Sequence, residues 1–210
     1  DNTLIAGDSD HLWGDFLVSE GLVDPDKHKA LNEHYYRQYQ QGQLDIDEYL
    51  YFALGPMAGM TPETLSALQD KFLKKHVEPI LLDAAFDLLQ AHRVKGDTLI
   101  IITATNTLVT QPIADRLGVE YLIGCEAELK DGRYTGKPEG VPSFGEGKVQ
   151  RIKAWCAEHQ TPLEGAIFYS DSHNDLPLLR EVAHAVAVDP DDVLRLEAQQ
   201  CGWEIISLRP

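Results

Sequence analysis

The stretch Ala166-Ile167-Phe168-Tyr169-Ser170-Asp171-Ser172-His173-Asn174-Asp175 joins a short apolar run to two carboxylates. Residues 166–170 are rich in β-forming side chains and predict a buried strand, after which the chain enters a helix predicted over 175–182. Asp171 and Asp175 therefore follow a strand, at the end where α/β proteins bind ligands. Hard carboxylate oxygens suit Mg²⁺. For this stretch alone, a solvated loop in which Asp175 caps the helix is the alternative.

The composition limits the class of protein. The chain has 210 residues, of which 43% are hydrophobic and 25% charged, so we expect a soluble globular domain with a real core. A net charge of −16 argues against nucleic acid as a partner, because phosphate backbones require a basic surface. The three cysteines form no CxxC pair, and no stretch resembles a signal peptide or a membrane span. We therefore predict a cytoplasmic protein that binds neither nucleic acid nor membrane.

The hydrophobic pattern divides the chain in two. From about residue 9 to about residue 93 the pattern is helical, and from residue 97 strands alternate with helices. Strands are predicted over 98–102, 121–124, 166–170, 185–188 and 203–208, with helices over 111–117, 146–159, 175–182 and 190–200, and a hairpin turn at 131–134. Such alternation implies right-handed crossovers and a parallel sheet, so the predicted fold class is α/β with a doubly wound sheet.

Polar residues stand at four points where predicted strands end or helices begin. In chain order these points are Asp1 with Thr3, then Thr103 with Thr105 and Asn106, then Lys148, and finally Asp171 with Asp175. All four fall on the ligand-binding edge of a doubly wound sheet. Phosphoryl transfer requires a clamp for the phosphate, a metal ion and a proton donor, and these residue types can provide all three.

Each of these residues has a specific use in that chemistry. Lys148 supplies a positive charge for phosphate oxygens, and the Thr103 hydroxyl can donate a hydrogen bond to them. Asp171 suits Mg²⁺, and Asp1 suits protonation of a leaving alkoxide followed by deprotonation of water. Taken singly, Thr103 is favoured as a helix cap, Lys148 as a solvated lysine and Asn106 as a turn residue. Their joint order favours a phosphoryl-transfer site.

Four segments of the chain resemble, in order, the four motifs of the haloacid dehalogenase (HAD) superfamily, close to its phosphoserine phosphatase-like branch, subfamily IB. Asp1-Asn2-Thr3-Leu4 resembles the second half of D-x-D-x-T, and Ile100-Ile101-Ile102-Thr103 resembles the strand that ends in Ser or Thr. Gly147-Lys148 resembles the helix-borne lysine, and residues 170–175 resemble the acidic fourth motif. The resemblance covers essentially the whole chain.

This resemblance implies a domain organisation and a role for each matched residue. A Rossmann-like core is expected over 1–8 and 82–210, with a helical C1 cap over 9–81 inserted after the first strand. The implied activity is Mg²⁺-dependent hydrolysis of a small-molecule phosphate ester through an aspartyl-phosphate. Asp1 matches the general acid/base and its carbonyl a metal ligand, Thr103 and Lys148 the phosphate-binding pair, Asp171 the direct metal ligand, and Asp175 the group that orients Asp171 and the metal waters.

One part of the family pattern is absent from the sequence. The family's nucleophile is the first Asp of D-x-D, which would stand two residues before Asp1, on a central strand that the sequence also lacks. A sheet without that strand would leave backbone groups unpaired on both of its neighbours. We therefore expect the natural protein to continue upstream of Asp1 with an apolar strand that carries this aspartate.

Substrate choice is expected to lie in the cap. Related phosphoserine phosphatases have a Glu seven residues after the general acid, where it contacts the substrate amino group, and this chain has Asp8. Arg37 is a candidate partner for a substrate carboxylate, although a solvated helix charge is favoured; Asn174 and Asn106 are further substrate-binding candidates. Additional cap candidates are Asp10, Trp13, Tyr35 and Tyr36. Segments 6–10 and 103–106 resemble a histidinol-phosphate phosphatase-like branch, so histidinol phosphate and phosphoserine are the expected substrates.

Two other functions stay open. A receiver domain also places acids, a hydroxyl and a lysine at the edge of a parallel sheet, although the long helical insertion argues against it. A catalytically silent phosphate- or metabolite-binding homologue is the second alternative, because the nucleophile is absent from the sequence. The oligomeric state is expected to be a monomer or a homodimer.

Overall fold

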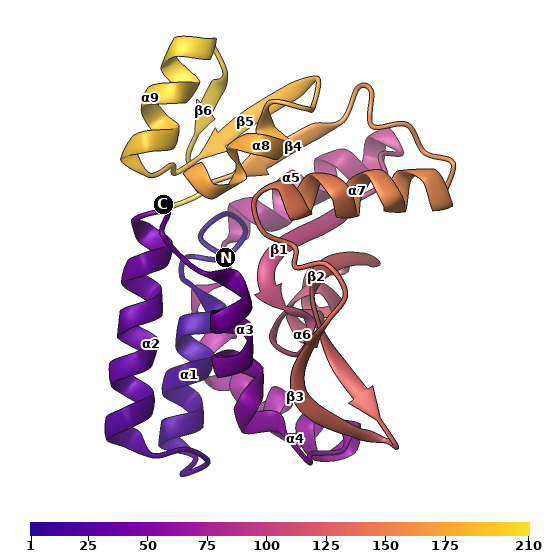
Figure 1. Cartoon of the computed structure of the whole chain (residues 1–210). Helices are drawn as coiled ribbons and strands as arrows, with labels where there is room; N and C mark the ends of the chain where they lie inside the picture. Colours follow the sequence, from indigo (N-terminus) through magenta and orange to yellow (C-terminus); the bar gives the residue numbers. More distant parts are fainter.

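The computed structural model describes all residues from Asp1 to Pro210. Four helices come first (Figure 1): α1 (Ser9–Ser19), α2 (Pro25–Gln40), α3 (Ile46–Leu54) and α4 (Pro62–Phe72). The alternating part then follows as α5 (Asp83–Lys95), β1 (Ile100–Asn106), α6 (Thr107–Leu117), β2 (Tyr121–Lys130), β3 (Arg133–Glu139), α7 (Glu146–Glu158), β4 (Ile167–Ser170), α8 (Leu176–Leu179), β5 (His184–Val188), α9 (Asp192–Cys201) and β6 (Glu204–Ile206). None of the helices combines the length and the apolar composition that a membrane span requires.

Short polar side chains begin the first helices. Asp8, Asp24 and Asp45 accept hydrogen bonds from backbone N–H groups in the first turns of α1, α2 and α3. Thr61 does the same for α4, in which a proline occupies the first turn. Gly96 ends α5 in the left-handed conformation, with φ of 82°. The helix boundaries are therefore set largely by local sequence.

The strands form two three-stranded sheets. In the first, β1 pairs in parallel with β2, and β2 pairs antiparallel with β3. In the second, β4, β5 and β6 are all parallel. The predicted α/β class with parallel strands is confirmed, with its strands divided between these two sheets.

Besides shifts in the bounds of β1, which continues to Asn106, and of α6, which begins at Thr107, two elements differ in extent from the sequence prediction. The strand predicted over 121–124 continues to Lys130, because its second half pairs with β3 across the turn at Asp131-Gly132. The helix predicted over 175–182 is reduced to α8, since residues His173–Asp175 form a 3₁₀ turn that begins where the Ser172 side chain accepts a hydrogen bond from the backbone of Asn174. Both differences arise from contacts that a hydrophobic pattern does not contain.

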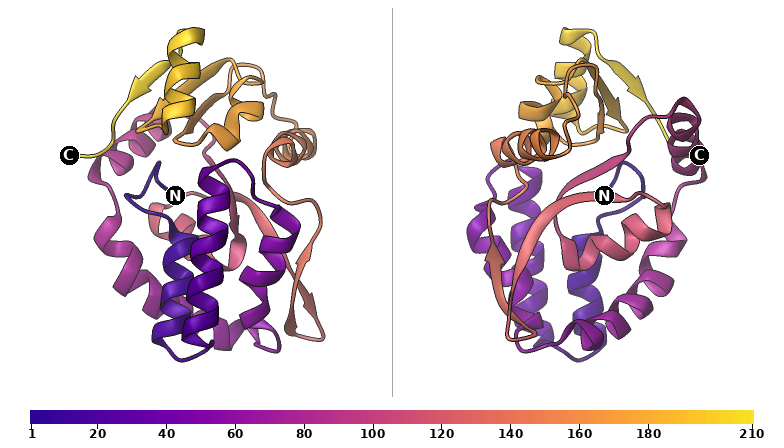
Figure 2. Two further views of the ribbon diagram at one scale, coloured as in Figure 1. Left: turned by 60° about the vertical axis from the view of Figure 1, so that its left-hand side comes forward. Right: turned by 90° about the vertical axis from the view of Figure 1, so that its right-hand side faces the viewer.

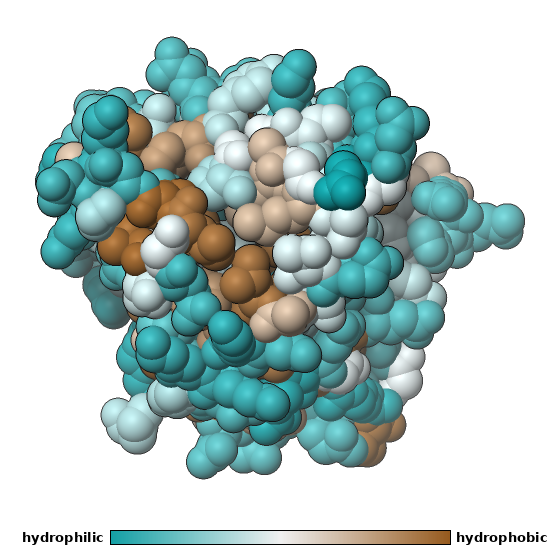
Figure 3. Space-filling view, turned by 90° about the horizontal axis from the view of Figure 1, so that it is seen from below, coloured by the Kyte–Doolittle hydropathy of each residue, from teal (hydrophilic) through white to brown (hydrophobic).

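The first four helices, which we call the cap helices, lie together at one end of the molecule, and β4–β6 with α9 lie at the other (Figures 1 and 2). The largest apolar cluster has 17 buried residues and includes Trp13, Phe16 and Phe72 from the cap helices with Val109 and Ile113 from α6. Seen from the end formed by the cap helices, the surface is mostly hydrophilic, with groups of apolar side chains among the hydrophilic ones (Figure 3). The division into a cap over 9–81 and a core stays a prediction, and the cap helices share their apolar cluster with α6.

Candidate active site

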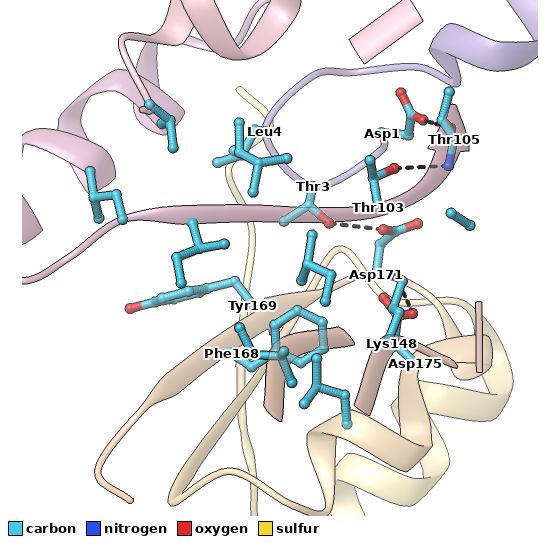
Figure 4. A pocket seen from close by; sticks show the side chains of 18 of the residues that line it. Asp1, Thr3, Leu4, Thr103, Thr105, Lys148, Phe168, Tyr169, Asp171 and Asp175 are labelled. Carbon is cyan, nitrogen blue, oxygen red and sulfur yellow. Dashed lines mark hydrogen bonds and ion pairs between the residues drawn. The ribbon is translucent and has the colours of Figure 1, made fainter. Parts of the chain in front are cut away.

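The amino-terminal segment lies at the ends of β1 and β4, where it meets residues far away in the sequence (Figure 4). The Thr105 hydroxyl donates a 2.7 Å hydrogen bond to Asp1 Oδ2, and the Ser9 backbone N–H donates to Asp1 Oδ1 at 2.8 Å. The Thr3 hydroxyl donates to Asp171 Oδ1 at 2.8 Å. The Asp1 carboxylate is thus fixed through both oxygens, and Asp171 through one.

Lys148 lies in the first turn of α7 and is 4% exposed. Its Nζ contacts Asp175 Oδ1 at 2.5 Å, and the Ser170 hydroxyl donates to Asp175 Oδ2 at 2.7 Å. Gly147 allows this turn to form, because a Cβ there would lie 2.1 Å from the carbonyl oxygen of Pro142. Both carboxylate oxygens of Asp175 are engaged, so Asp175 holds the buried lysine and does not cap α8.

Thr103 and Thr105 follow the apolar part of β1, where the pairing register with β2 shifts. Both are buried, and the Thr103 hydroxyl accepts a hydrogen bond from the Thr105 backbone N–H at 3.2 Å. Both line the same cavity as Asp1, Lys148 and Asp171. The structure therefore brings together, at one edge, residues from all four points singled out in the sequence.

The cavity has a volume of about 590 Å³ and runs between β1 and β4. Its walls include consecutive residues of both strands, namely Ile100, Ile101 and Ile102 from β1 and Ile167, Phe168 and Tyr169 from β4. Since consecutive side chains of a strand point to opposite faces, a cavity lined by all of them borders the strand edges. In agreement, β1 pairs only with β2, and β4 pairs only with β5.

Comparison with known proteins identifies the family. A model of haloacid dehalogenase-like hydrolases matches residues 1–180. The chain belongs to this family. It is 42% identical over 213 residues to a histidinol-phosphatase of Neisseria meningitidis serogroup C, covering 100% of the chain and 96% of that protein.

Two solved structures place this hydrolase among known folds. A protein of unknown function from Bordetella pertussis Tohama I is 41% identical, with a TM-score of 0.92 over 100% of this chain and 96% of that one. A phospho-aspartyl intermediate analogue of phosphoserine phosphatase has a TM-score of 0.68 over 100% of this chain and 90% of that one. At 15% identity, the second similarity shows the fold alone.

The electrostatics of the hydrolase site are dominated by buried acids. Burial raises the pKa of the Asp171 carboxyl, against the lowering effect of the hydrogen bond from Thr3. No three His, Cys, Asp or Glu side chains come close enough together to form a complete metal site from side chains alone. Any metal here would need backbone or solvent oxygens in addition to Asp171.

The predicted substrate-binding residues have different surroundings. Asp8 lines the cavity, and one of its oxygens accepts hydrogen bonds from the first turn of α1. Asn106 is fully buried and caps α6 by accepting from the Val109 N–H at 3.3 Å, away from the cavity lining. Arg37 is exposed on α2 and does not line the cavity either. Their roles in substrate binding stay predictions.

Asn174 joins the two ends of the molecule. Its Nδ2 donates to the backbone carbonyl of Tyr39, at the end of α2, and to Ser172 Oγ, each at 3.2 Å. The Tyr39 hydroxyl in turn donates to Ser172 Oγ at 3.3 Å. The sequence prediction did not include Tyr39, because only the fold brings it to the loop of Asp171 and Asp175. It quoted Ser170 within the motif 170–175 but gave it no role, and the structure shows its hydroxyl donating to Asp175. The spacing of Tyr35, Tyr36 and Tyr39 on one helix was the available signal for Tyr39.

Proposed function

We propose that this protein is a phosphatase that hydrolyses the monoester of a small phosphorylated metabolite such as histidinol phosphate or phosphoserine. The observation that carries the proposal is the convergence of Asp1, Thr103, Lys148 and Asp171 on one cavity from four separate parts of the chain. Such a set combines a proton donor, an anion clamp and a metal-binding carboxylate. The 42% identity to a histidinol-phosphatase supports the same activity.

The phosphate group is bound by Lys148 and Thr103. Lys148 is held beneath the site by its ion pair with Asp175, so its charge is positioned before the substrate arrives. The Thr103 hydroxyl lines the cavity and donates to a second phosphate oxygen. Asp175 serves as a positioning residue, because both of its oxygens are engaged by Lys148 and Ser170.

Asp1 is the general acid and base. The Thr105 hydroxyl and the Ser9 N–H fix its carboxyl group at the cavity, as proton transfer at a defined atom requires. Asp1 gives its proton to the ester oxygen as the P–O bond of the substrate breaks. It then takes a proton from the water that attacks phosphorus, which releases inorganic phosphate and restores the enzyme.

The residues at this edge fit Mg²⁺. Asp171 is a largely buried carboxylate whose Oδ1 accepts from Thr3 and whose Oδ2 has no hydrogen-bond partner in another residue, so a cation would offset its desolvation. Asp171 would hold the ion directly, together with the carbonyl of Asp1, while Asp175 would act through the Asp171 loop. When bound, Mg²⁺ supplies positive charge against the oxygens of the phosphate.

The nucleophile in this proposal is the first aspartate of the family's D-x-D pattern, whose second aspartate Asp1 resembles. That carboxylate attacks phosphorus, forming an aspartyl-phosphate that water then hydrolyses.

The test uses the protein as its gene encodes it and measures phosphate release from histidinol phosphate with and without Mg²⁺. Replacement Asp171→Asn is expected to lower kcat/KM by roughly 10³-fold, the scale of losing a major electrostatic partner of the transition state. Asp192→Asn, on the exposed start of α9, is the matched control and should leave kcat/KM unchanged. Full turnover by Asp171→Asn would refute the metal assignment. Substrate binding without phosphate release would favour the silent homologue, and a stable phosphoprotein would favour the receiver domain.

A further inference from the structure

Asp191, the residue before α9, contacts the loop that carries Asp171 through both its main chain and its side chain. Its backbone N–H donates a hydrogen bond to the carbonyl oxygen of Asp171 at 2.9 Å. Its Oδ2 is bonded to the backbone N–H of His173 and to His173 Nδ1, each at 2.7 Å. Because the Thr3 hydroxyl donates to Asp171 Oδ1 (Figure 4), the loop is held at its main chain by Asp191 and at its carboxylate by Thr3.

The other carboxylate oxygen of Asp191 has a separate, local role. Oδ1 accepts a hydrogen bond from the Leu194 backbone N–H at 2.8 Å and thereby caps α9. A helix cap needs one such oxygen, which Asp, Asn and Ser supply about equally well. The two bonds from Oδ2 to His173 are therefore additional to the cap and are not explained by it.

The main chain just before Asp191 is strained. Asp189 has a φ of 44°, in the left-handed region that residues other than glycine rarely adopt. Its Oδ2 accepts from the Leu208 backbone N–H at 3.1 Å and pairs with Arg209 Nη1 at 2.9 Å. Arg209 also donates to the carbonyl oxygen of Asn2, in the amino-terminal segment of the site, at 3.2 Å. Strain of this kind persists only where the surrounding contacts impose it, and it gathers at functional sites.

We infer that Asp191 is a positioning residue that holds the loop of Asp171 so that Asp171 Oδ2 is presented to Mg²⁺. The inference rests on the proposed phosphatase function and adds to it a residue outside the four segments predicted from the sequence. Asp191 touches neither the substrate nor the ion in this role, and it acts through the main chain of Asp171 and through His173. Groups that orient a metal ligand in this way contribute substantially to metal affinity.

The test measures Mg²⁺ binding to the gene-encoded protein by calorimetry, without substrate. Asp191→Asn keeps an oxygen for the helix cap and places an NH₂ group, which cannot accept a hydrogen bond, against His173. It should weaken Mg²⁺ affinity by about tenfold or more. Asp24→Asn is the matched control, because it makes the same change at the cap of α2, where the side chain accepts only from the Lys27 N–H and lies outside the cavity lining. Its Mg²⁺ affinity should equal that of wild type.

Turnover of histidinol phosphate provides a second readout. The Mg²⁺ concentration that gives half the maximal rate should rise about tenfold in Asp191→Asn, while KM for the ester at saturating Mg²⁺ should change less than about twofold. A lower free energy of unfolding with unchanged Mg²⁺ affinity would show a structural role only and overturn the inference.

A second variant separates positioning from folding. Asp191→Ser also caps α9, with one oxygen atom in place of two, and should weaken Mg²⁺ binding as Asp191→Asn does. Wild-type affinity in Asp191→Ser would overturn the inference, and so would loss of folding in both variants, since Asp191 would then support the fold as a whole. Failure of the proposed function has a different signature, because wild type would then release no phosphate from histidinol phosphate or phosphoserine, whereas the calorimetric comparison would still report on Asp191.

Discussion

The two ends of the molecule are stabilised to different degrees by apolar burial. The helical half, made of the cap helices, α6 and the β2–β3 hairpin, shares one cluster of 17 buried residues. The sheet half, made of β4–β6 with α8 and α9, relies on separate clusters of five buried residues each. One of them contains three alanines, and the other is shared with Leu82 and with Ala85 of α5. Because apolar burial is the main favourable term in folding, the helical half should contain most of the stabilising core.

Near the site, the contact between these halves is mostly polar. Thr3 joins Asp171, and Tyr39 and Asn174 meet at Ser172. Each such hydrogen bond contributes little net stability, about 1 kcal/mol, yet each fixes a group at a defined distance from the cavity. Stability and chemistry therefore depend on different parts of this chain. This division can be tested by substitutions in either half and at the boundary between them.

The largest stability effect is expected within the helical half. Leu54 and Leu194 are both fully buried, the first in the 17-residue cluster and the second in a five-residue cluster. Leu54→Ala should lower the free energy of unfolding by roughly 4 kcal/mol and Leu194→Ala by roughly 2.5 kcal/mol, because a site near the edge collapses more readily around the lost volume. Urea unfolding measures both. Equal losses would contradict the proposed difference between the halves.

A smaller effect should appear as a pH dependence within the helical half, where α1 meets the cavity. The pKa of Asp10 is raised to about 7 by burial and by Asp8, while Tyr49 and Cys125 are its other titratable neighbours. An acid with a raised pKa binds more protons in the folded than in the unfolded state, so its contribution to stability is full below the unfolded pKa of about 4 and is lost as the pH rises towards about 7.

Asp10→Asn removes this dependence. Relative to wild type, it should gain about 2 kcal/mol in free energy of unfolding between about pH 4 and pH 8, in the absence of substrate, which is about half of what a pKa change from about 4 to about 7 implies in full, because Asp10 is only partly buried. Urea unfolding of both proteins across this range gives the difference directly. Asp47→Asn, exposed on α3, should show no such trend. Parallel stability curves for wild type and Asp10→Asn would mean that the Asp10 carboxyl is better solvated than its surroundings indicate.

The sequence predicted the alternating part of the fold because period and turn residues are local signals. The Thr61-Pro62 helix start and the strand before Asp171 are examples. The extension of β2 to Lys130 was not predictable from the run itself, because its polar second half is stabilised by pairing with β3. The reduction of the last predicted helix near Asp175 depends on the Ser172 turn.

For the site, residue order along strand ends was enough to predict which residues meet at one edge. It did not reveal the hydrogen-bonding partners that distinguish the two aspartates, because Lys148 and Thr3 come from separate segments and the direction of the Ser170 side chain is not a feature of the sequence pattern. These partners explain why Asp175 is fully engaged while Asp171 keeps one free oxygen. The substrate-binding roles of Asn106 and Arg37 stay predictions, and neither residue lines the cavity.

The smallest effect concerns the polar boundary itself. Asn174→Ala removes the two hydrogen bonds from Nδ2 to the Tyr39 carbonyl and Ser172 Oγ, and should lower the free energy of unfolding by about 1 kcal/mol. Tyr39→Phe, which removes the hydroxyl that also bonds Ser172, should cost a similar amount. Gln199→Ala, exposed on α9, is the control.

Asn174 and Tyr39 share one acceptor atom, Ser172 Oγ. The losses of free energy of unfolding in Asn174→Ala and Tyr39→Phe should therefore not be additive. A double-mutant cycle is expected to give a coupling energy of about 0.5 kcal/mol, measured by urea unfolding. The double variant should also raise KM for the substrate more than it lowers kcat, since these groups orient the cap helices over the cavity rather than touch phosphorus. Strictly additive losses would contradict the shared acceptor. A loss of several kcal/mol from Asn174→Ala alone would show that this polar boundary contributes to stability as much as the apolar clusters do, and would contradict the division between stability and chemistry.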